Sequence, residues 1–260
     1  MNKLDNVKSA RSEVSRISEI FSSLQGEGPH MGEPHIFVRF EECNIHCAYC
    51  DELGKPAVSM GIDEVFSKIL ELEKSGGPHH FVSLTGGEPL LYVQFIDPLI
   101  DLLRQRGFPI YLETSGILPK ALIQVVDRVD VVAMDIKLKS VTKEPRNYFD
   151  EHREFLRISN HAARSSGGRP LGSAAPRGRR REVFIKMIVS PEVDADEFLT
   201  GVRIIEAEDP QIVLVLQGVT SPDINENAQK DVLRELQKTA LRFLPNVRIM
   251  PRLHIAMGIR

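Results

Sequence analysis

Three cysteines place the strongest constraint on this chain. They are the only cysteines among its 260 residues, and they fall within one stretch of eight, as Cys43, Cys47 and Cys50. An odd number argues against a disulfide framework, in which cysteines are used in pairs. Independent placement would rarely bring three so close together. Three thiolates at this spacing on one loop can bind a single compact metal centre, so the fold must present this loop at a site.

The absence of a fourth cysteine narrows the kind of centre. Thiolate ligands favour zinc or iron–sulfur clusters. Structural zinc usually takes four ligands, and a [4Fe–4S] cluster normally takes four cysteines. His46 lies next to Cys47 and is poorly placed to complete a tetrahedron. Three cysteines would leave one iron of a cluster open to bind a substrate or cofactor; the alternative is a buried trio without a metal.

The composition is that of an ordinary globular protein, with 42% hydrophobic residues, 27% charged residues and a net charge of -3. These values exclude disorder, collagen and coiled coil for the whole chain. No apolar run approaches the roughly 20 residues of a membrane span, so no membrane is expected as a partner. The first residues lack the apolar core of a secretory signal, which favours the cytoplasm. The near-neutral charge gives no general reason to expect a nucleic acid partner.

Short apolar runs rich in Val, Ile or Phe, which are typical of buried parallel strands, alternate with stretches at helical spacing. The predicted strands are 35–40, 81–84, 110–113, 129–135, 183–189 and 212–217. The first predicted helix begins at Ile62 and ends at Gly76–Pro78. The other predicted helices are 95–103, 118–126, 147–163, 194–205 and 223–243. Six strands with helices between them predict parallel βα units. Periodicity alone leaves a partial barrel, a complete barrel and an open doubly wound sheet as alternatives.

One segment departs from this pattern. Residues 155–181 contain no acidic residue but seven arginines, and from Arg164 to Arg181 the composition is mostly Gly, Ser, Pro, Ala and Arg. We predict a flexible, arginine-rich surface insertion at 161–181. The alternative is an electrostatic patch for an anionic partner. Residues 1–16 are predicted to be an N-terminal tail, and 17–260 a single core domain that carries this insertion.

Polar motifs follow four of the predicted strands. The cysteine loop follows 35–40, Thr85–Pro89 follows 81–84, Glu113–Gly116 ends the third strand, and Asp135–Lys137 ends the fourth. The carboxyl ends of parallel strands meet at one edge, where such folds carry their chemistry. We therefore expect these motifs to form one site.

The Cys-x-x-x-Cys-x-x-Cys spacing, with Tyr49 before the last cysteine, resembles the signature of the radical S-adenosylmethionine superfamily, and the Gly-Gly-Glu motif after the second strand agrees with it. The resemblance implies a partial (β/α)6-type barrel of parallel strands. It also implies a [4Fe–4S] cluster on the three cysteines, with the amino and carboxylate groups of S-adenosylmethionine on the open iron. The residues so assigned to the cofactors are Tyr49, Asp51, Gly86, Gly87, Glu88, Glu113, Ser115, Asp135, Ile136 and Lys137.

Further segments narrow the resemblance. Ser23–Gly28, Gly32–Phe40, Leu216–Gly218 and Arg252–Arg260 together resemble the 7-carboxy-7-deazaguanine synthase family, over roughly 17–260 apart from the insertion. This family is a group of lyases that make the 7-deazapurine precursor of queuosine. The resemblance implies a radical ring contraction of 6-carboxy-5,6,7,8-tetrahydropterin with loss of ammonia, a flavodoxin- or ferredoxin-type reductant, and a homodimer.

The same resemblance assigns residues to the pterin. Glu27 and Gln25 suit its amine donors, and Arg39 can form a bidentate pair with its carboxylate. Glu27 and Arg39 are counted with the cysteines as catalytic. The residues assigned to the substrate are Leu24, Gln25, Gly26, Glu27, Arg39, Thr85, Gln217, His254 and the terminal carboxylate of Arg260.

Each of these assignments has a structural alternative. Arg39 would then be a surface cation, Gln25 and Glu27 turn residues, and His254 a buried imidazole with a satisfied hydrogen bond. Asp135 and Lys137 would pair with each other.

Glu52 departs from the family pattern. The residue two places after the last cysteine is usually a threonine whose hydroxyl helps to bind Mg²⁺. A glutamate is also a hard oxygen ligand, so Glu52 either binds Mg²⁺, pairs with a different metal, or replaces the ion with a carboxylate contact.

Two other functions share the cysteine loop. An activase that makes a glycyl radical on another protein would not need the Leu24–Gly28 segment or the C-terminal motif. A non-catalytic iron–sulfur or zinc regulator would not need intact Gly-Gly-Glu and Asp-Ile-Lys motifs. Both are therefore kept only as alternatives.

Overall fold

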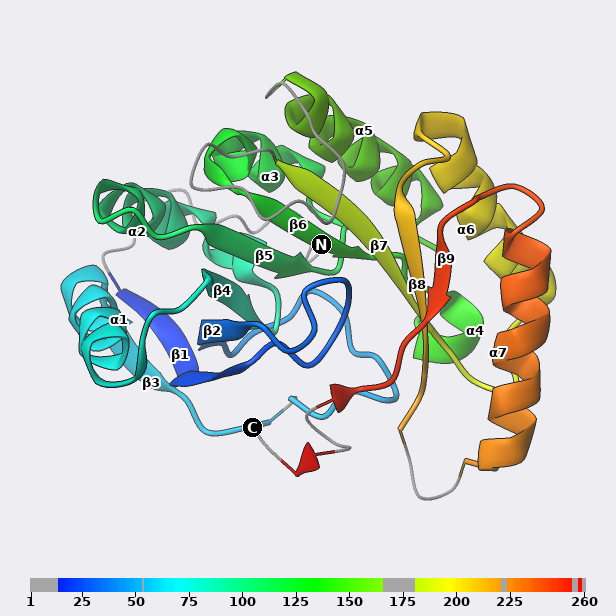
Figure 1. The fold of residues 1–260 in the computed structure, drawn as a ribbon, viewed down its shortest axis with the longest axis horizontal. Helices are drawn as coiled ribbons and strands as arrows, with labels where there is room; N and C mark the ends of the chain where they lie inside the picture. Colours follow the sequence, from blue (N-terminus) through cyan, green and yellow to red (C-terminus); the bar gives the residue numbers. More distant parts are fainter. Residues whose placement is uncertain (1–13, 53, 166–180, 221–223, 254–256, 259–260) are drawn as a thin grey trace.

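The computed structural model describes residues 14–52, 54–165, 181–220, 224–253 and 257–258. Nine strands form one curved sheet (Figure 1). In spatial order they are β3 (Val58–Gly61), β1 (Val14–Leu24), β2 (Pro34–Phe40), β4 (Phe81–Gly86), β5 (Ile110–Thr114), β6 (Val131–Asp135), β7 (Glu182–Val189), β8 (Val213–Gly218) and β9 (Val247–Ile249). Strands β2 to β9 are parallel to one another, and β1 is antiparallel to both β2 and β3. This mostly parallel sheet confirms the predicted α/β partial barrel.

The six predicted strands are all present, with ends that move by at most two residues. Strands β1, β3 and β9 were not predicted. In β1, polar residues separate Ile17 from Ile20 and Phe21, so this half-exposed strand lacks the continuous apolar run of a buried parallel strand. Because β1 begins at Val14, residues 14–16 belong to the sheet and not to the tail predicted for 1–16.

Helices follow the parallel strands and lie along the outer side of the sheet (Figure 1). They are α1 (Ile62–Gly76), α2 (Val93–Gln105), α3 (Pro119–Val125), α4 (Lys139–Thr142), α5 (Phe149–Ser165), α6 (Ala195–Glu208) and α7 (Glu226–Ala240), with 3₁₀ turns η2 (Pro89–Tyr92) and η3 (Val126–Arg128). Side chains fix some of their starts: Asp194 and Asn225 accept hydrogen bonds from the first-turn N–H groups of α6 and α7.

The predicted insertion overlaps described structure at both ends. Helix α5 continues to Ser165, so 161–165 are helical and the insertion begins later than predicted. Arg164 pairs with Asp209 at 2.8 Å, and Arg181 pairs with Asp127 at 3.0 Å. Residues 166–180 lie outside the described residues.

Alternation along the strands separates the core from the site. Ile36, Val38, Val82 and Leu84 are fully buried in the main hydrophobic cluster under the helices. The residues between them in sequence point to the inner side, because successive side chains of a strand face opposite ways. Arg39 on β2 and Thr85 on β4, which are paired across the two strands, therefore both face a cavity instead of the core.

The loop between β1 and β2 fills part of the inner side (Figure 1). Gly28 has a φ of 71°, and a Cβ there would lie 2.7 Å from the ring of Phe184 on β7. Only glycine adopts this positive φ readily and also leaves room for the Phe184 ring. Farther along, the His30 ring packs edge-on against Tyr111 at 5.6 Å between centroids. The loop therefore occupies the amino-end half of the barrel and leaves the carboxyl ends of the strands open.

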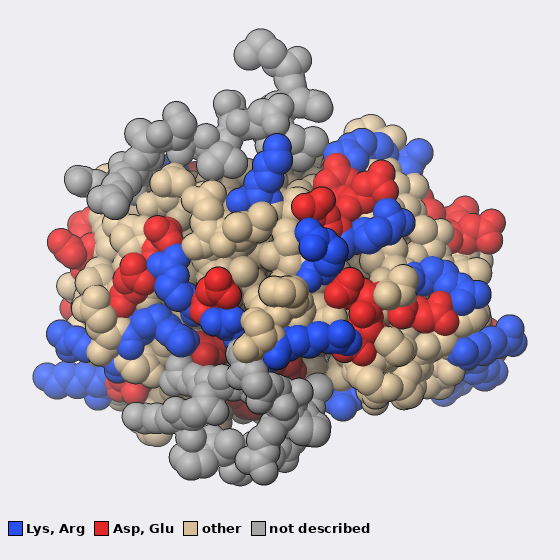
Figure 2. All heavy atoms as spheres, turned by 90° about the horizontal axis from the view of Figure 1, so that it is seen from above, with Lys and Arg blue, Asp and Glu red and all other residues tan. Residues whose placement is uncertain are grey.

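No described helix has the length and apolar character needed to cross a membrane. Acidic and basic side chains are interspersed on the face in Figure 2. Many described charges are paired locally, as in Lys230–Glu226 on α7 and Arg203–Glu206 on α6.

Candidate active site

A cavity of about 220 Å³ opens at the carboxyl ends of β2, β4, β5, β6 and β7. The predicted strand-end motifs meet here, as expected. The predicted site residues that line it are Leu24, Gln25, Gly26, Glu27, Arg39, Cys43, Cys47, Tyr49, Cys50, Asp51, Glu52, Thr85, Gly86, Gly87, Glu113, Ser115, Asp135 and Lys137. Three others, Glu88, Ile136 and Gln217, do not line it. His254 and Arg260 lie outside the described residues.

The cysteine loop is anchored through its backbone. His46 N–H donates to Glu144 Oε1 at 2.8 Å, and Ala48 N–H donates to the Thr142 carbonyl at 2.9 Å. Ile45 packs with Ile117 and Tyr148, which seals the loop against the sheet. All three cysteines line the cavity, and Cys43 Sγ also donates to Asn44 Oδ1 at 3.7 Å.

The three thiols supply the kind of ligand that an iron–sulfur cluster needs. Cys43, Cys47 and Cys50 are free cysteines that line one cavity. Burial, and then the nearby Glu88 carboxylate, raise the pKa of Cys43 to about 12. A thiolate at this position therefore requires a cation, and bound metal ions deprotonate coordinating thiols outright.

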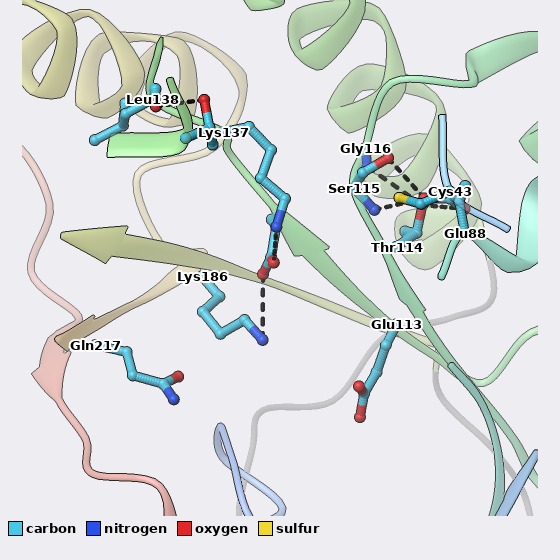
Figure 3. A network of polar contacts seen from close by, with 12 residues as sticks. Cys43, Glu88, Glu113, Thr114, Ser115, Gly116, Lys137, Leu138, Lys186 and Gln217 are labelled. Atoms are coloured by element: carbon cyan, nitrogen blue, oxygen red, sulfur yellow. Dashed lines mark hydrogen bonds and ion pairs between the residues drawn. The ribbon is translucent and has the colours of Figure 1, made fainter. Parts of the chain in front are cut away.

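Glu88 lies behind the cavity wall, between the ends of two strands. Its carboxylate is fully buried and accepts hydrogen bonds from Ser115 Oγ at 2.6 Å, Ser115 N–H at 2.7 Å and Thr114 Oγ1 at 2.9 Å (Figure 3). Leu90 N–H adds a fourth at 3.0 Å. Through these hydrogen bonds, Glu88 ties the end of β4 to the end of β5.

The two glycines before Glu88 bring β4 against the start of the cysteine loop. A Cβ on Gly87 would lie 2.0 Å from the Glu42 carbonyl oxygen. Gly87 N–H donates to the Phe40 carbonyl at 2.8 Å, and Glu88 N–H donates to that of Glu42 at 2.7 Å. The motif thus positions the loop that holds the cysteines.

A chain of opposite charges crosses the cavity. Lys186 Nζ lies 2.5 Å from Glu27 Oε2 and 3.4 Å from Asp135 Oδ1, and Lys137 Nζ lies 2.6 Å from Asp135 Oδ2. Figure 3 shows Lys137, which follows the end of β6, and Lys186, from β7, pointing toward each other. Asp135 and Lys137 thus do pair with each other, as in the structural alternative to their assignment to a cofactor. Gln217 joins through Glu27, donating from Nε2 to Oε1 at 3.0 Å.

The pKa shifts favour the charged forms of Glu27, Lys137 and Lys186. Burial would raise the pKa of Glu27, but the charges and hydrogen bonds of Lys186, Gln217 and Arg252 lower it to about 2. Burial would likewise lower the pKa values of Lys137 and Lys186, but Asp135 in particular raises both. Glu27 is therefore an acceptor, not a proton donor, at neutral pH.

Arg39 is already paired on the cavity wall. Its Nη1 lies 3.1 Å from Glu19 Oε2 and 3.3 Å from Glu52 Oε1, and its guanidinium lies 4.8 Å from the centroid of Phe21. Glu52 also accepts from Lys55 Nζ at 2.7 Å. Glu52 is thus already engaged by two cations. Among the described residues, no three His, Cys, Asp or Glu side chains, the three cysteines included, are arranged to hold a single metal ion in this structure.

Gln25 orders the loop that carries Glu27. Its Nε2 donates to Glu113 Oε1 at 2.9 Å, and its Oε1 accepts from Glu27 N–H at 3.1 Å. Glu113 Oε2 also accepts from Thr85 Oγ1 at 2.7 Å. Gln25 and Glu113 therefore form one wall between the loop and β5.

The comparisons with known proteins agree with this geometry. Residues 37–166 match the model of the Radical SAM superfamily. Over 264 residues the chain is 33% identical to a 7-carboxy-7-deazaguanine synthase of Geobacter sulfurreducens, covering 94% of this chain and 97% of the relative. The chain belongs to the 7-carboxy-7-deazaguanine synthase family of radical SAM enzymes.

Another member of that family, from Methanothermobacter thermautotrophicus, is 28% identical over 268 residues, and the match covers 94% of this chain and 97% of the relative. The crystal structure of QueE from Escherichia coli matches with a TM-score of 0.59 and 20% identity, over 94% of this chain and 96% of that one, which shows a shared fold. Membership of the radical SAM superfamily implies a [4Fe–4S] cluster and S-adenosylmethionine. Membership of the synthase family favours that activity over both alternatives, the glycyl-radical activase, which would also be a radical SAM enzyme, and the non-catalytic regulator.

Two charged residues of the 7-carboxy-7-deazaguanine synthase site were missed in the sequence. Lys186 is the single charged residue within the apolar run Val183–Val189. A lone lysine in a buried strand is unusual and could have indicated a residue of the site. Arg252 begins the C-terminal motif and reaches back to Asp51, with 2.7 Å between Nη1 and Oδ2. Leu253 N–H donates to the Gly26 carbonyl at 2.8 Å, which fixes this segment at the cavity.

Proposed function

We propose that this chain converts 6-carboxy-5,6,7,8-tetrahydropterin to 7-carboxy-7-deazaguanine with loss of ammonia. The observation that supports it best is the convergence of the three cysteines and the Glu27–Lys186–Asp135–Lys137 charge chain on one cavity. One end of that cavity offers thiols, and the other offers a fixed carboxylate acceptor beside cations. A cofactor and a polar, anionic substrate can therefore lie side by side.

The cysteine end is the proposed cofactor site. Cys43, Cys47 and Cys50 would hold the [4Fe–4S] cluster, which with bound S-adenosylmethionine supplies the radical that removes a hydrogen atom from the substrate. Gly86, Gly87, Ser115 and Lys137 line the wall around it and are proposed to contact the nucleoside and its methionine part. The close approach that the glycines permit gives such a ligand access to the backbone.

The other end is the proposed pterin site. Glu27 is ionised and held in place by Lys186 and Gln217, so it can accept hydrogen bonds from the amine edge of the ring without turning. Thr85 and the Gln25–Glu113 wall shape the space beside it. These residues need not transfer a proton. They hold the ring in a reactive orientation and exclude water, which is the protein's main contribution to a radical reaction.

We propose that Arg39 takes the place of a metal ion at Glu52. The family resemblance implies Mg²⁺ beside residue 52, but here the Glu52 carboxylate already contacts Arg39 and Lys55. A divalent ion would have to displace two cations from one carboxylate. We therefore assign no step to Mg²⁺.

The reductant, the cellular location and the assembly are further proposals. Cys50 is exposed, which supports approach of a flavodoxin- or ferredoxin-type reductant from this side. The composition of the chain supports a cytoplasmic location. Exposed Val58, on the edge strand β3, and exposed Val14, at the start of the adjacent strand β1, support a homodimer, which sedimentation over a range of concentrations would test.

The reaction itself is tested anaerobically. Reconstituted protein is incubated with dithionite, S-adenosylmethionine and 6-carboxy-5,6,7,8-tetrahydropterin, and a new ultraviolet-absorbing deazapurine is expected. Cys47→Ala should lose both the cluster iron and the product. Formation of 5′-deoxyadenosine alone, without any deazapurine, would contradict the substrate assignment while leaving the radical chemistry intact.

A further inference from the structure

Arg252 has a buried donor without a partner. Its side chain is 12% exposed and lines the cavity. Nε is buried without a hydrogen-bond partner, and it lies 3.6 Å from Glu27 Oε1, too far for a hydrogen bond. A buried N–H of a cation that remains unpaired is unfavourable, and in native proteins such a group usually meets a ligand or water.

The other three cationic side chains of the described cavity are more fully engaged. Lys186 bridges Glu27 and Asp135, and Lys137 pairs with Asp135. Arg39 pairs with Glu19 and Glu52. The hydrogen-bonded partner of Arg252 is Asp51, whose side chain is 62% exposed, and exposed ion pairs contribute little. Arg252 is therefore the cation that an incoming anion can engage with the smallest loss of existing contacts.

The position of Arg252 selects between two possible anions. Both S-adenosylmethionine and the proposed pterin carry a carboxylate, and a guanidinium binds either as a bidentate pair. Arg252 lies against Glu27, and the adjoining Leu253 N–H bonds to Gly26. Both contacts are on the loop proposed for the pterin, whereas the proposed S-adenosylmethionine wall consists of residues from β4, β5 and β6.

We propose that Arg252 binds the carboxylate of the pterin substrate and so makes the enzyme specific for the carboxylated ring. The substrate carboxylate would engage Nε and take the place of Asp51 on the guanidinium. This inference rests on the proposed function, since it names a specificity-determining residue for that substrate. Arg39, the residue that sequence analysis assigned to the carboxylate, would then serve mainly as the partner of Glu52.

The test compares two pterins on the holoenzyme. Cluster-containing protein with S-adenosylmethionine, but without reductant, is titrated calorimetrically with 6-carboxy-5,6,7,8-tetrahydropterin and with tetrahydropterin lacking the carboxylate. Loss of a charged hydrogen-bonded pair should weaken binding of the carboxylated ligand to Arg252→Gln by about 10- to 100-fold. Binding of the ligand without a carboxylate should change by less than about two-fold. Arg252→Lys should recover part of the loss.

Controls separate this role from a structural one. Arg248→Gln, at an exposed position on β9, should bind both pterins like the wild type. Equal losses for both pterins in Arg252→Gln, or no loss for either, would overturn the inference. Weakened binding of S-adenosylmethionine instead of the pterin would assign Arg252 to that carboxylate and overturn it as well. If the wild type binds neither pterin, the proposed function itself fails.

Discussion

Lys186 Nζ contacts Glu27 Oε2 at 2.5 Å although the two residues are 159 positions apart in the chain. Glu27 comes from the loop between β1 and β2, and Lys186 from the middle of β7, so the pair joins the antiparallel edge of the sheet to its parallel centre. Both side chains are largely buried, at 21% and 14% exposure. The contact fixes the acceptor that we propose for the pterin and also holds the loop inside the barrel.

Removal of Lys186 should destabilise the fold more than removal of both partners. Lys186→Met leaves the Glu27 carboxylate buried with a weaker set of partners, Gln217 and Arg252. Breaking one side of a buried ion pair typically lowers the free energy of unfolding by about 3–5 kcal/mol. Denaturant unfolding should show this loss, and the Lys186→Met/Glu27→Gln double variant should regain part of it. A double variant less stable than Lys186→Met would contradict the assignment.

Acid should weaken the fold through Glu27. Its folded-state pKa is lowered from 4.5 to about 2 against the opposing effect of burial. A carboxyl with a lowered folded pKa contributes stability that is complete above its unfolded pKa and is lost as the pH falls through the folded value. Between those two pKa values about 3 kcal/mol should disappear, since each pKa unit corresponds to roughly 1.4 kcal/mol.

The measurement is urea unfolding of apoprotein at a series of acidic pH values, because acid also dissolves iron–sulfur clusters. Glu27→Gln should lack this part of the pH dependence. Parallel curves for the wild type and Glu27→Gln would show that the stabilisation arises elsewhere.

The sequence was informative where local pattern decides structure. Buried parallel strands are continuous apolar runs, so six were predicted and their polar ends were correctly placed on one rim. Strand β1 was missed because polar residues interrupt its apolar ones and only a few of its side chains are buried. Local pattern alone could predict neither its register nor the tail boundary.

Partners far apart in sequence could not be predicted in the same way. Whether Glu88 turns into the cavity or toward Thr114 and Ser115 depends on how closely β4 and β5 end together. The pairing of Arg39 with Glu19 depends on the register of β1 against β2. Motif spacing identifies which residue types reach the rim, but packing between elements decides which of them remain available to a ligand.

Glu144 should control how well the cysteine loop keeps its cluster. Its Oε1 accepts from His46 N–H at 2.8 Å, and its Oε2 accepts from Tyr148 Oη–H at 2.7 Å. Glu144→Ala removes the acceptor that fixes the loop between Cys43 and Cys47, so iron content after reconstitution should fall and iron should be lost faster to a chelator. Glu154→Ala, at an exposed position on α5, should behave like the wild type. Unchanged iron retention in Glu144→Ala would mean that Ala48 and Ile45 suffice to hold the loop.

Turnover should not depend on added magnesium. Arg39 and Lys55 already neutralise Glu52, at 3.3 Å and 2.7 Å from its Oε1, so the position needs no divalent cation for charge balance. Deazapurine formation after exhaustive chelation should stay within about two-fold of its rate with Mg²⁺ restored, a difference under about 0.5 kcal/mol. Glu52→Gln should likewise leave turnover independent of added Mg²⁺, because it removes only the carboxylate that contacts Arg39 and Lys55. A large, saturable restoration of activity by Mg²⁺ in the wild type, absent from Glu52→Gln, would show instead that Glu52 is a metal ligand and that the Arg39 contact yields to the ion.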